Sequence, residues 1–202
     1  MAAGEPGGQP MSTARFDPMA GLRAQNAQGV VAGVPHRPWP WYPADMTVAD
    51  TSKTLVVAMG ADHAGVALKA LLREALEEAG HQVLDLGTNG PESVDYPDFG
   101  AAVAEAVAAG KARLGVLVCG TGIGISMAAN RNPAIRCALI HDVTGARLTR
   151  QHNDANVIAF GARMTGPEVA LDALRAFIDT PFEGGRHCRR VEKLSPGWSP
   201  SP

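Results

Sequence analysis

Short apolar runs alternate with longer amphipathic stretches along the chain from Thr54 onward. The run 55–60 predicts a buried strand, and apolar positions between Val66 and Ala79 then recur at helical spacing until Gly80 ends the helix. The same alternation continues to residue 178. It predicts further strands at 82–86, 114–119, 136–140 and 157–160, and further helices at 99–109, from near 122, at 143–151 and at 167–178.

Several of the predicted strands are apolar on both faces, as in LGVLVC at 114–119 and NVIAF at 156–160. Such strands are typical of parallel sheets that helices cover on both sides. Connections between parallel strands are right-handed, which fixes how the helices pack back onto the sheet. We therefore expect an α/β fold, a three-layer α/β/α sandwich with a five-stranded parallel sheet of the Rossmann-like type.

Two segments of different composition flank this pattern. The first 43 residues hold seven of the 15 prolines and two of the three tryptophans, and they show no periodicity. Repeated proline removes backbone donors and restricts the preceding residue, so residues 1–53 are predicted to be a disordered extension. Translation from a later methionine and docking of the aromatic cluster 39–42 both stay open. Residues 54–194 form the expected domain, and its last part, beyond Pro181, is basic with little apolar periodicity. Residues 195–202 are expected to be a frayed tail.

Composition and charge exclude several classes of protein. The 18 Lys and Arg residues against 20 Asp and Glu residues give a formal net charge of −2, with no basic run suited to nucleic acid. No apolar stretch approaches the roughly 20 residues of a membrane helix, and the N-terminus lacks the apolar core of a secretory signal. Three scattered cysteines fit a reducing compartment, so we expect a cytoplasmic protein.

Polar side chains gather at the predicted carboxyl ends of the strands, which form the ligand crevice of an open parallel sheet. They include Asp62 and His63 after the first strand, Tyr96 after the second, Cys119 after the third, His141 and Asp142 after the fourth, and Arg163 after the fifth. A turn at 150–154 precedes the fifth strand. Asparagine is common in turns, so Asn153 needs no functional role to be found there. For His152 a functional and a structural role stay equally open.

The loop CGTGIG at 119–124 carries the most chemical information. Its three alternating glycines, between a strand and a helix, leave backbone N–H groups free to converge on an anion, although a tight turn also uses glycine. The loop lacks the third glycine of the dinucleotide fingerprint and the Lys-Ser/Thr pair of a P-loop. A cysteine phosphatase would need an arginine where Ile125 stands. Cys119 is either a base or nucleophile beside a helix N-terminus, or a small buried residue.

Five motifs in one order are similar to those of the type B ribose-5-phosphate isomerases, which also include subunits of galactose-6-phosphate isomerase. The motifs are GADHAG at 60–65, DYP at 95–97, CGTGIG at 119–124, RQHNDAN at 150–156 and EGGRH at 183–187. Together they span about residues 54–194, and the leader has no counterpart. One form of the family uses the loop cysteine as its base, and the other has a small residue there and an acid four positions later. Cys119 and Ile123 resemble the cysteine form.

The resemblance implies interconversion of D-ribose 5-phosphate and D-ribulose 5-phosphate through an enediolate, with no cofactor and no metal. Cys119 would move the proton between C2 and C1, Thr121 and the loop amides would stabilise the oxyanion, and His152 would open the sugar ring. The residues implied in substrate binding are Asp62, His63, Tyr96, Gly120, Gly122, Ile123, Gly124, Asn153, Arg163, Arg186 and Arg190. Arginine suits the phosphate because its planar fork binds oxyanions in pairs.

The resemblance also implies a homodimer, or a tetramer built from it, in which two subunits share each active site. Isomerisation of a four-carbon sugar phosphate, of allose 6-phosphate or of galactose 6-phosphate stays open, because the catalytic loop would be the same. A phosphosugar-binding module without turnover is the alternative from another class. A binder, however, has no need of a base such as Cys119.

Overall fold

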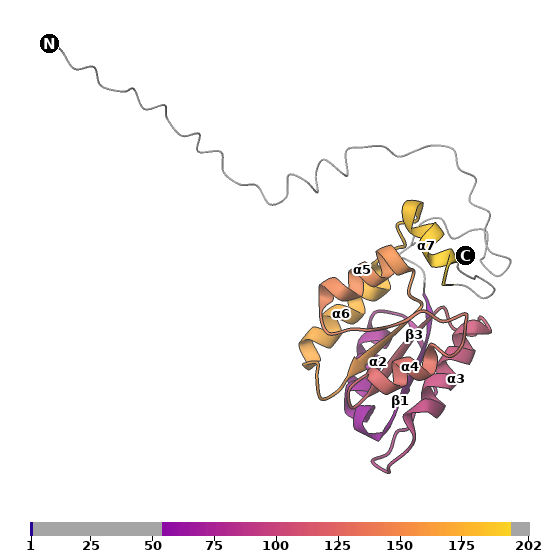
Figure 1. The fold of residues 1–202 in the computed structure, drawn as a ribbon. Helices are drawn as coiled ribbons and strands as arrows, with labels where there is room; N and C mark the ends of the chain where they lie inside the picture. Colours follow the sequence, from indigo (N-terminus) through magenta and orange to yellow (C-terminus); the bar gives the residue numbers. More distant parts are fainter. Residues whose placement is uncertain (2–53, 195–202) are drawn as a thin grey trace. The chain divides into compact units, whose positions relative to one another are not determined.

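The computed structural model describes Met1 and residues 54–194, so the predicted extension and tail lie outside the described residues. Contacts within the chain divide it into two units, 1–45 and 46–202. All the helices and strands of the described residues belong to the second unit (Figure 1). The strands are β1 (Val56–Ala61), β2 (Gln82–Asp85), β3 (Leu114–Cys119), β4 (Cys137–Leu139) and β5 (Val157–Gly161). The helices are η1 (His63–Gly65), α2 (Val66–Glu78), α3 (Tyr96–Ala108), α4 (Ile123–Ala129), α5 (Val143–Asn153), α6 (Pro167–Asp179), η2 (Gly185–His187) and α7 (Cys188–Glu192).

The five strands form one parallel sheet in the order β2-β1-β3-β5-β4. This sheet confirms the predicted α/β fold. Strand β2 lies on one side of β1, whereas β3, β5 and β4 lie on its other side. The direction in which the chain builds the sheet therefore reverses between β1 and β3. The amide of Asp62 donates to the carbonyl of Val118 at 3.2 Å, which joins the two strand ends at this point. Ligand crevices of open α/β sheets lie at such reversals.

Helices cover both faces of the sheet and bury a separate core on each. Val57 and Met59 pack on the side of α2, α5 and α6, whereas the intervening Ala58 packs on the side of α3 and α4. Successive residues of a strand point to opposite faces, so strands with both faces apolar supply both cores. No helix within residues 54–194 is long and apolar enough to cross a membrane.

The structure differs from the predicted elements at three functionally relevant places. Helix α3 begins at Tyr96, with Pro97 in its first turn, where proline is favoured. Helix α5 extends to Asn153, so His152 lies in its last turn and not in a loop. The segment after Pro181, predicted without regular structure, forms η2 and α7. These helices are too short to show an apolar period, and α7 buries Val191 alone.

Candidate active site

Cys119 ends β3 at the reversal point of the sheet. Its side chain is buried, and its sulfur accepts a hydrogen bond from the amide of Gly122 at 3.1 Å. The loop can turn back to give this contact because Gly122 adopts a positive φ of 75°, and a Cβ there would lie 2.4 Å from Cδ1 of Leu139. An N–H donor at the sulfur stabilises negative charge there, so the loop is suited to hold a thiolate.

The loop does not leave all of its backbone N–H groups free to converge on an anion. The Gly122 amide, expected to stabilise an oxyanion, is directed at the sulfur of Cys119. The amide of Ile123 donates to Oγ1 of Thr121 at 3.3 Å, which orients the exposed hydroxyl. The Thr121 hydroxyl and the Gly120 and Gly124 amides are therefore the groups left for a substrate oxyanion.

Asp62 and His63 follow β1 on the other side of the reversal point. Oδ1 of Asp62 accepts from the amides of Ala64 and Gly65 at 3.0 and 3.1 Å, so part of this carboxylate caps η1. Nδ1 of His63 accepts from the amide of Val94 at 3.3 Å. A neutral imidazole that accepts at Nδ1 carries its proton on Nε2, which leaves a donor for a ligand.

Tyr96 and Arg163 complete this edge of the sheet. The Tyr96 ring covers Gly124 so closely that a Cβ on this glycine would lie 2.5 Å from Cζ of the ring. The guanidinium of Arg163 lies beside Gly120, and the Arg163 amide donates to the Gly120 carbonyl at 3.0 Å. The carboxyl edge thus brings together a buried sulfur, a carboxylate, an imidazole, a phenol and a guanidinium.

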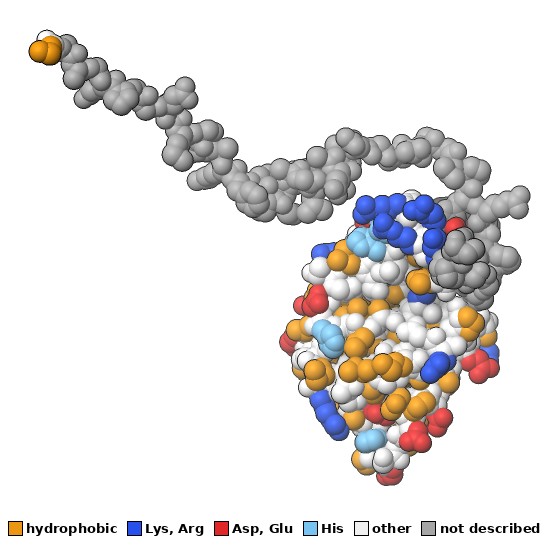
Figure 2. All heavy atoms as spheres, in the orientation of Figure 1, with side chains coloured by type: hydrophobic (Ala, Val, Ile, Leu, Met, Phe, Trp, Pro, Cys, Tyr) orange, Lys and Arg blue, Asp and Glu red, His pale blue; other side chains and the backbone are white. Residues whose placement is uncertain are grey.

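The remaining predicted residues lie elsewhere, around the C-terminal end of α5. The His152 ring stacks on the ring of His187, with centroids 4.4 Å apart and planes 6° apart. Oε2 of Glu183 lies 3.9 Å from Nε2 of His152 and 3.7 Å from Nε2 of His187. Asn153 follows in the same turn of α5, and Arg186 and Arg190 are exposed on η2 and α7. Figure 2 shows the basic side chains gathered over α7.

A buried ion network fixes this end of α5. Asp154 takes a left-handed conformation with a φ of 44°, and its carboxylate binds Arg136 and Arg150, each at 2.8 Å. Nη1 of Arg150 also donates to the carbonyl of Ala155 at 2.6 Å, and Arg136 donates to the carbonyls of Asn153 and Asp154. The backbone that carries His152 is therefore held in one conformation.

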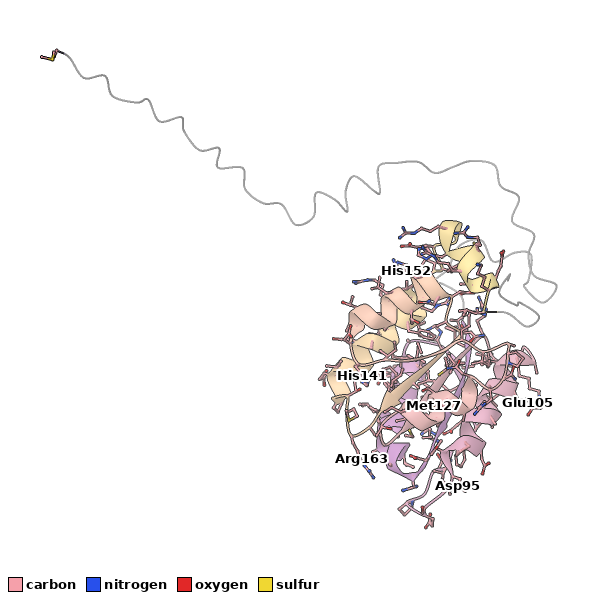
Figure 3. The ribbon with its side chains drawn as sticks, viewed as in Figure 1. Asp95, Glu105, Met127, His141, His152 and Arg163 are labelled. Atoms are coloured by element: carbon pink, nitrogen blue, oxygen red, sulfur yellow. The ribbon has the colours of Figure 1, made fainter. Side chains whose placement is uncertain are left out.

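The two groups of residues lie at opposite edges of the sheet. Cys119 is the last residue of β3, whereas His152 precedes the amino end of β5, the parallel neighbour of β3. Strand β3 has six residues, which at about 3.3 Å each separate the edges by about 20 Å. Figure 3 shows the same separation, with His152 beside α7 and Arg163 and Asp95 toward the other end. Within one chain, His152 and Arg186 therefore cannot act on a molecule bound at Cys119.

His152, Glu183 and His187 are the described residues whose ligand atoms come within 4.8 Å of one another, which raises the question of a metal site. A metal ion binds imidazole in the plane of the ring, along the nitrogen lone pair. Two rings stacked at 6° cannot both direct a lone pair at one ion between them. The geometry therefore does not fit a metal ion held by both imidazoles.

A family model described as Ribose/Galactose Isomerase matches residues 57–194. The chain belongs to this family. Ribose-5-phosphate isomerase B of Escherichia coli is 45% identical over 139 residues, which cover 69% of this chain and 93% of the relative. D-erythrulose-4-phosphate isomerase of Pectobacterium atrosepticum is 41% identical over 141 residues, which cover 69% of this chain and 93% of the relative.

Solved structures agree with this membership. Ribose-5-phosphate isomerase B of Clostridium thermocellum superposes with a TM-score of 0.69 at 47% identity, covering 69% of this chain and 95% of that chain. The type B enzyme of Trypanosoma brucei gives 0.68 at 46% identity, covering 70% and 97%. The family, the fold and the enzyme class, an isomerase, are thus the ones that the sequence motifs indicate.

Proposed function

We propose that this isomerase interconverts D-ribose 5-phosphate and D-ribulose 5-phosphate, with Cys119 as the base. The observation that carries the proposal is the buried Cys119 sulfur with an amide donor 3.1 Å away at the reversal point of the sheet. A binding module needs no such group, whereas proton abstraction beside a carbonyl needs a base within reach of carbon. The identity to ribose-5-phosphate isomerase B of Escherichia coli supports the choice of substrate.

Ring opening is the first step, because a five-carbon aldose phosphate is mostly a closed ring. The hydroxyl at C1 loses its proton, the C1–O bond to the ring oxygen breaks, and the ring oxygen gains a proton. His152 serves this exchange as the proton donor to the ring oxygen. Asp62 and Asn153 bind the sugar hydroxyls, and Tyr96 lines the pocket.

Isomerisation then moves one proton along the open chain. The Cys119 thiolate takes the proton from C2, and the electron pair forms the C1=C2 bond as negative charge moves onto O1. The hydroxyl of Thr121 and the Gly120 and Gly124 amides stabilise this charge. The O2 proton passes to O1, and the thiol returns its proton to C1, which leaves the carbonyl at C2. The sulfur of Cys119 is buried, which limits exchange of this proton with solvent.

The proposal requires a homodimer in which each site combines two subunits. Within the described chain, Cys119 and His152 lie at opposite edges of the sheet, about 20 Å apart by strand length. In a dimer with two-fold symmetry, the C-terminal end of α5 and helix α7 of one subunit lie against the carboxyl ends of the strands of the other subunit. The exposed apolar side chains of Ile123 and Met127 on α4, beside the catalytic loop, support such a contact.

In this dimer, cationic side chains from both subunits bind the phosphate. His63 and Arg163 belong to the carboxyl edge, whereas Arg186 and Arg190 come from the partner's η2 and α7 in the proposed dimer. A dianion held by several guanidinium and imidazole groups needs no metal ion for charge balance.

A panel of aldose phosphates with four, five and six carbons tests the substrate. Activity is followed by enzymatic detection of the ketose product, and kcat/KM is compared across the panel. We expect the five-carbon substrate to have the highest kcat/KM. The similarity to D-erythrulose-4-phosphate isomerase makes a four-carbon substrate the second candidate, and a higher kcat/KM for it would overturn our choice.

A further inference from the structure

Lys69 is a buried cation that the proposed mechanism does not use. It lies in α2, its side chain is 2% exposed, and its Nζ donates to both carboxylate oxygens of Asp85, at 2.5 and 2.7 Å. The third donor of the ammonium group reaches Oδ1 of Asn89 at 2.8 Å. An ammonium taken out of water is tolerated where its donors are paired, so Asn89 completes the surroundings of Lys69.

These contacts attach the loop 86–95, which joins β2 to α3, to helix α2. The Asp85 carboxylate also accepts from the amide of Gly87 at 3.1 Å. A Cβ on Gly87 would lie 2.4 Å from the amide nitrogen of Ala61, so the start of the loop packs directly on the end of β1. Through Asn89 the ammonium group holds the loop two residues further on.

The other end of loop 86–95 reaches the candidate active site. The Val94 amide donates to Nδ1 of His63 at 3.3 Å. This hydrogen bond leaves Nε2 of His63 as the donor for a ligand. The orientation of the imidazole therefore depends on where the loop places the Val94 amide.

The middle of the loop contributes little to its own position. Pro91, Glu92 and Ser93 are exposed. An exposed loop with little buried surface opens at a low cost in free energy. The contacts at Asn89 and at His63, on either side of this exposed stretch, therefore determine where the loop lies.

We infer that Lys69 and Asn89 are positioning residues for His63. They hold loop 86–95 in place, and the loop orients the imidazole through the Val94 amide. This inference rests on the proposed function, because His63 is there one of the groups that bind the phosphate. Neither Lys69 nor Asn89 touches the substrate. They act on substrate binding through the orientation of the Nε2 donor.

Asn89→Leu tests the contact, because removal of Lys69 would strip the Asp85 carboxylate of its nearest cation and threaten the fold. Exchange of the Val94 amide with water, followed by NMR, measures whether the loop stays on His63. We expect the exchange rate to rise about threefold to tenfold in Asn89→Leu, toward the rate in His63→Ala, which lacks the acceptor. Asn89→Asp keeps an acceptor for the ammonium group and should stay near the parent.

Steady-state kinetics with D-ribose 5-phosphate supplies the second measurement. Asn89→Leu should raise KM about threefold to tenfold, since part of the lost hydrogen-bond energy is transmitted to the ring. It should leave kcat within about twofold, because proton transfer at Cys119 is untouched. The double variant His63→Ala/Asn89→Leu should have the KM of His63→Ala alone, since Asn89 acts through that ring.

Gln82→Leu is the matched control. It removes an exposed amide side chain at the other end of β2, away from loop 86–95. It should match the parent in Val94 exchange, in KM and in kcat. Far-UV circular dichroism melting of each variant checks that it folds.

The outcomes separate this inference from the proposed function. Unchanged Val94 exchange in Asn89→Leu would overturn the inference, whatever the substrate is. A rise in KM that persists in full in the His63→Ala background would also overturn it, because Asn89 would then act by another route. So would a fall in kcat at constant KM. If the parent does not convert D-ribose 5-phosphate, the proposed function fails, and Val94 exchange alone decides whether Asn89 positions His63.

Discussion

The three cysteines of the chain have different surroundings, and Cys119 is the one that ends a strand at the reversal point of the sheet, with the Gly122 amide donating to its sulfur at 3.1 Å. Cys137 is the first residue of β4, and burial raises the pKa of its thiol to about 12, so it stays protonated at neutral pH. Burial also raises the pKa of Cys188 in α7. The sulfur of the proposed base thus differs from the other two in the Gly122 amide that donates to it and in its place at the carboxyl end of β3.

Replacing Cys119 with alanine should lower kcat by about 10²–10⁴-fold, the usual effect of a positioned base. KM should change little, because the sulfur binds neither the phosphate nor the hydroxyls in the proposed mechanism. Steady-state kinetics of D-ribose 5-phosphate conversion measures both constants. Cys137→Ala and Cys188→Ala are the controls and should keep most of the activity. A Cys119→Ala protein within threefold of the parent would show that the base is another group.

Cys119 could be predicted as a candidate base from the sequence because its loop has a local signature of alternating glycines after an apolar strand. Glu183 and His187 gave no comparable signal as partners of His152. They lie 31 and 35 positions further along the chain, and only the packing of η2 against the end of α5 brings them together. The EGGRH motif marks the segment, but it does not say which ring the carboxylate faces.

At the scale of elements, the periodicity of apolar residues predicts the strands and the longer helices. It does not predict the exact ends of these elements or the short helices. The predicted strand 114–119 agrees with β3 in full, since an apolar run between glycine-containing turns leaves little choice. The helix predicted at 99–109 starts three residues earlier, at Tyr96, because Asp95 and Pro97 form a helix start that apolar spacing does not reveal. The α7 helix of five residues is shorter than two turns, so no period can show in its sequence.

The contact between the first turn of α4 and the start of α3 should determine the shape of the sugar pocket. Gly124→Ala places a methyl group where Tyr96 now lies, 2.5 Å from Cζ, so the ring must move. We expect kcat/KM to fall by about tenfold or more, because displacement of a pocket residue by about 1 Å disturbs substrate position. The melting temperature should change little, since alanine favours the helix and Tyr96 is exposed.

Gly145→Ala is the matched control for this change. Gly145 also lies in the first turn of a helix, α5, and a Cβ there would meet the Asp142 carboxylate at an ordinary 3.4 Å. It should keep parental kcat/KM. If Gly124→Ala behaves in the same way, Tyr96 does not shape the pocket.

At the scale of the whole molecule, the extension is predicted to be dispensable. The span from Val56 to Glu192, helices, strands and the loops between them, contains both cores and all candidate site residues. A chain that starts at Met46 should therefore fold and turn over like the full chain, because residues 1–45 offer little periodic apolar surface to bury. Thermal melting and kcat/KM of the two forms provide the comparison. Loss of solubility or activity would show that the first 45 residues belong to the fold.

The separation of Cys119 from Arg186 and His152 makes the assembly itself testable. In the proposed dimer, Cys119→Ala and Arg186→Ala each damage both sites when present alone. In a mixed dimer, one site receives the intact Cys119 of one subunit and the intact Arg186 of the other, while the second site receives both defects. Random exchange makes half of the dimers mixed, with one good site of two, so activity should recover to roughly a quarter of the parent.

Subunit exchange under mild denaturant, followed by refolding and assay, measures this recovery, and native mass spectrometry counts the mixed dimers. A His152→Ala partner in place of Arg186→Ala should give the same recovery, since both residues lie at the amino edge of the sheet. Mixing Arg186→Ala with His152→Ala is the decisive control, because both belong to the same edge of one subunit. In that mixture each site still receives one defect from whichever subunit supplies the amino edge, so no activity should return. Recovery there would mean that the Arg186 and the His152 of one site come from different subunits. Absence of recovery with Cys119→Ala would place all three residues in one subunit's site, against the 20 Å or so that the strands impose.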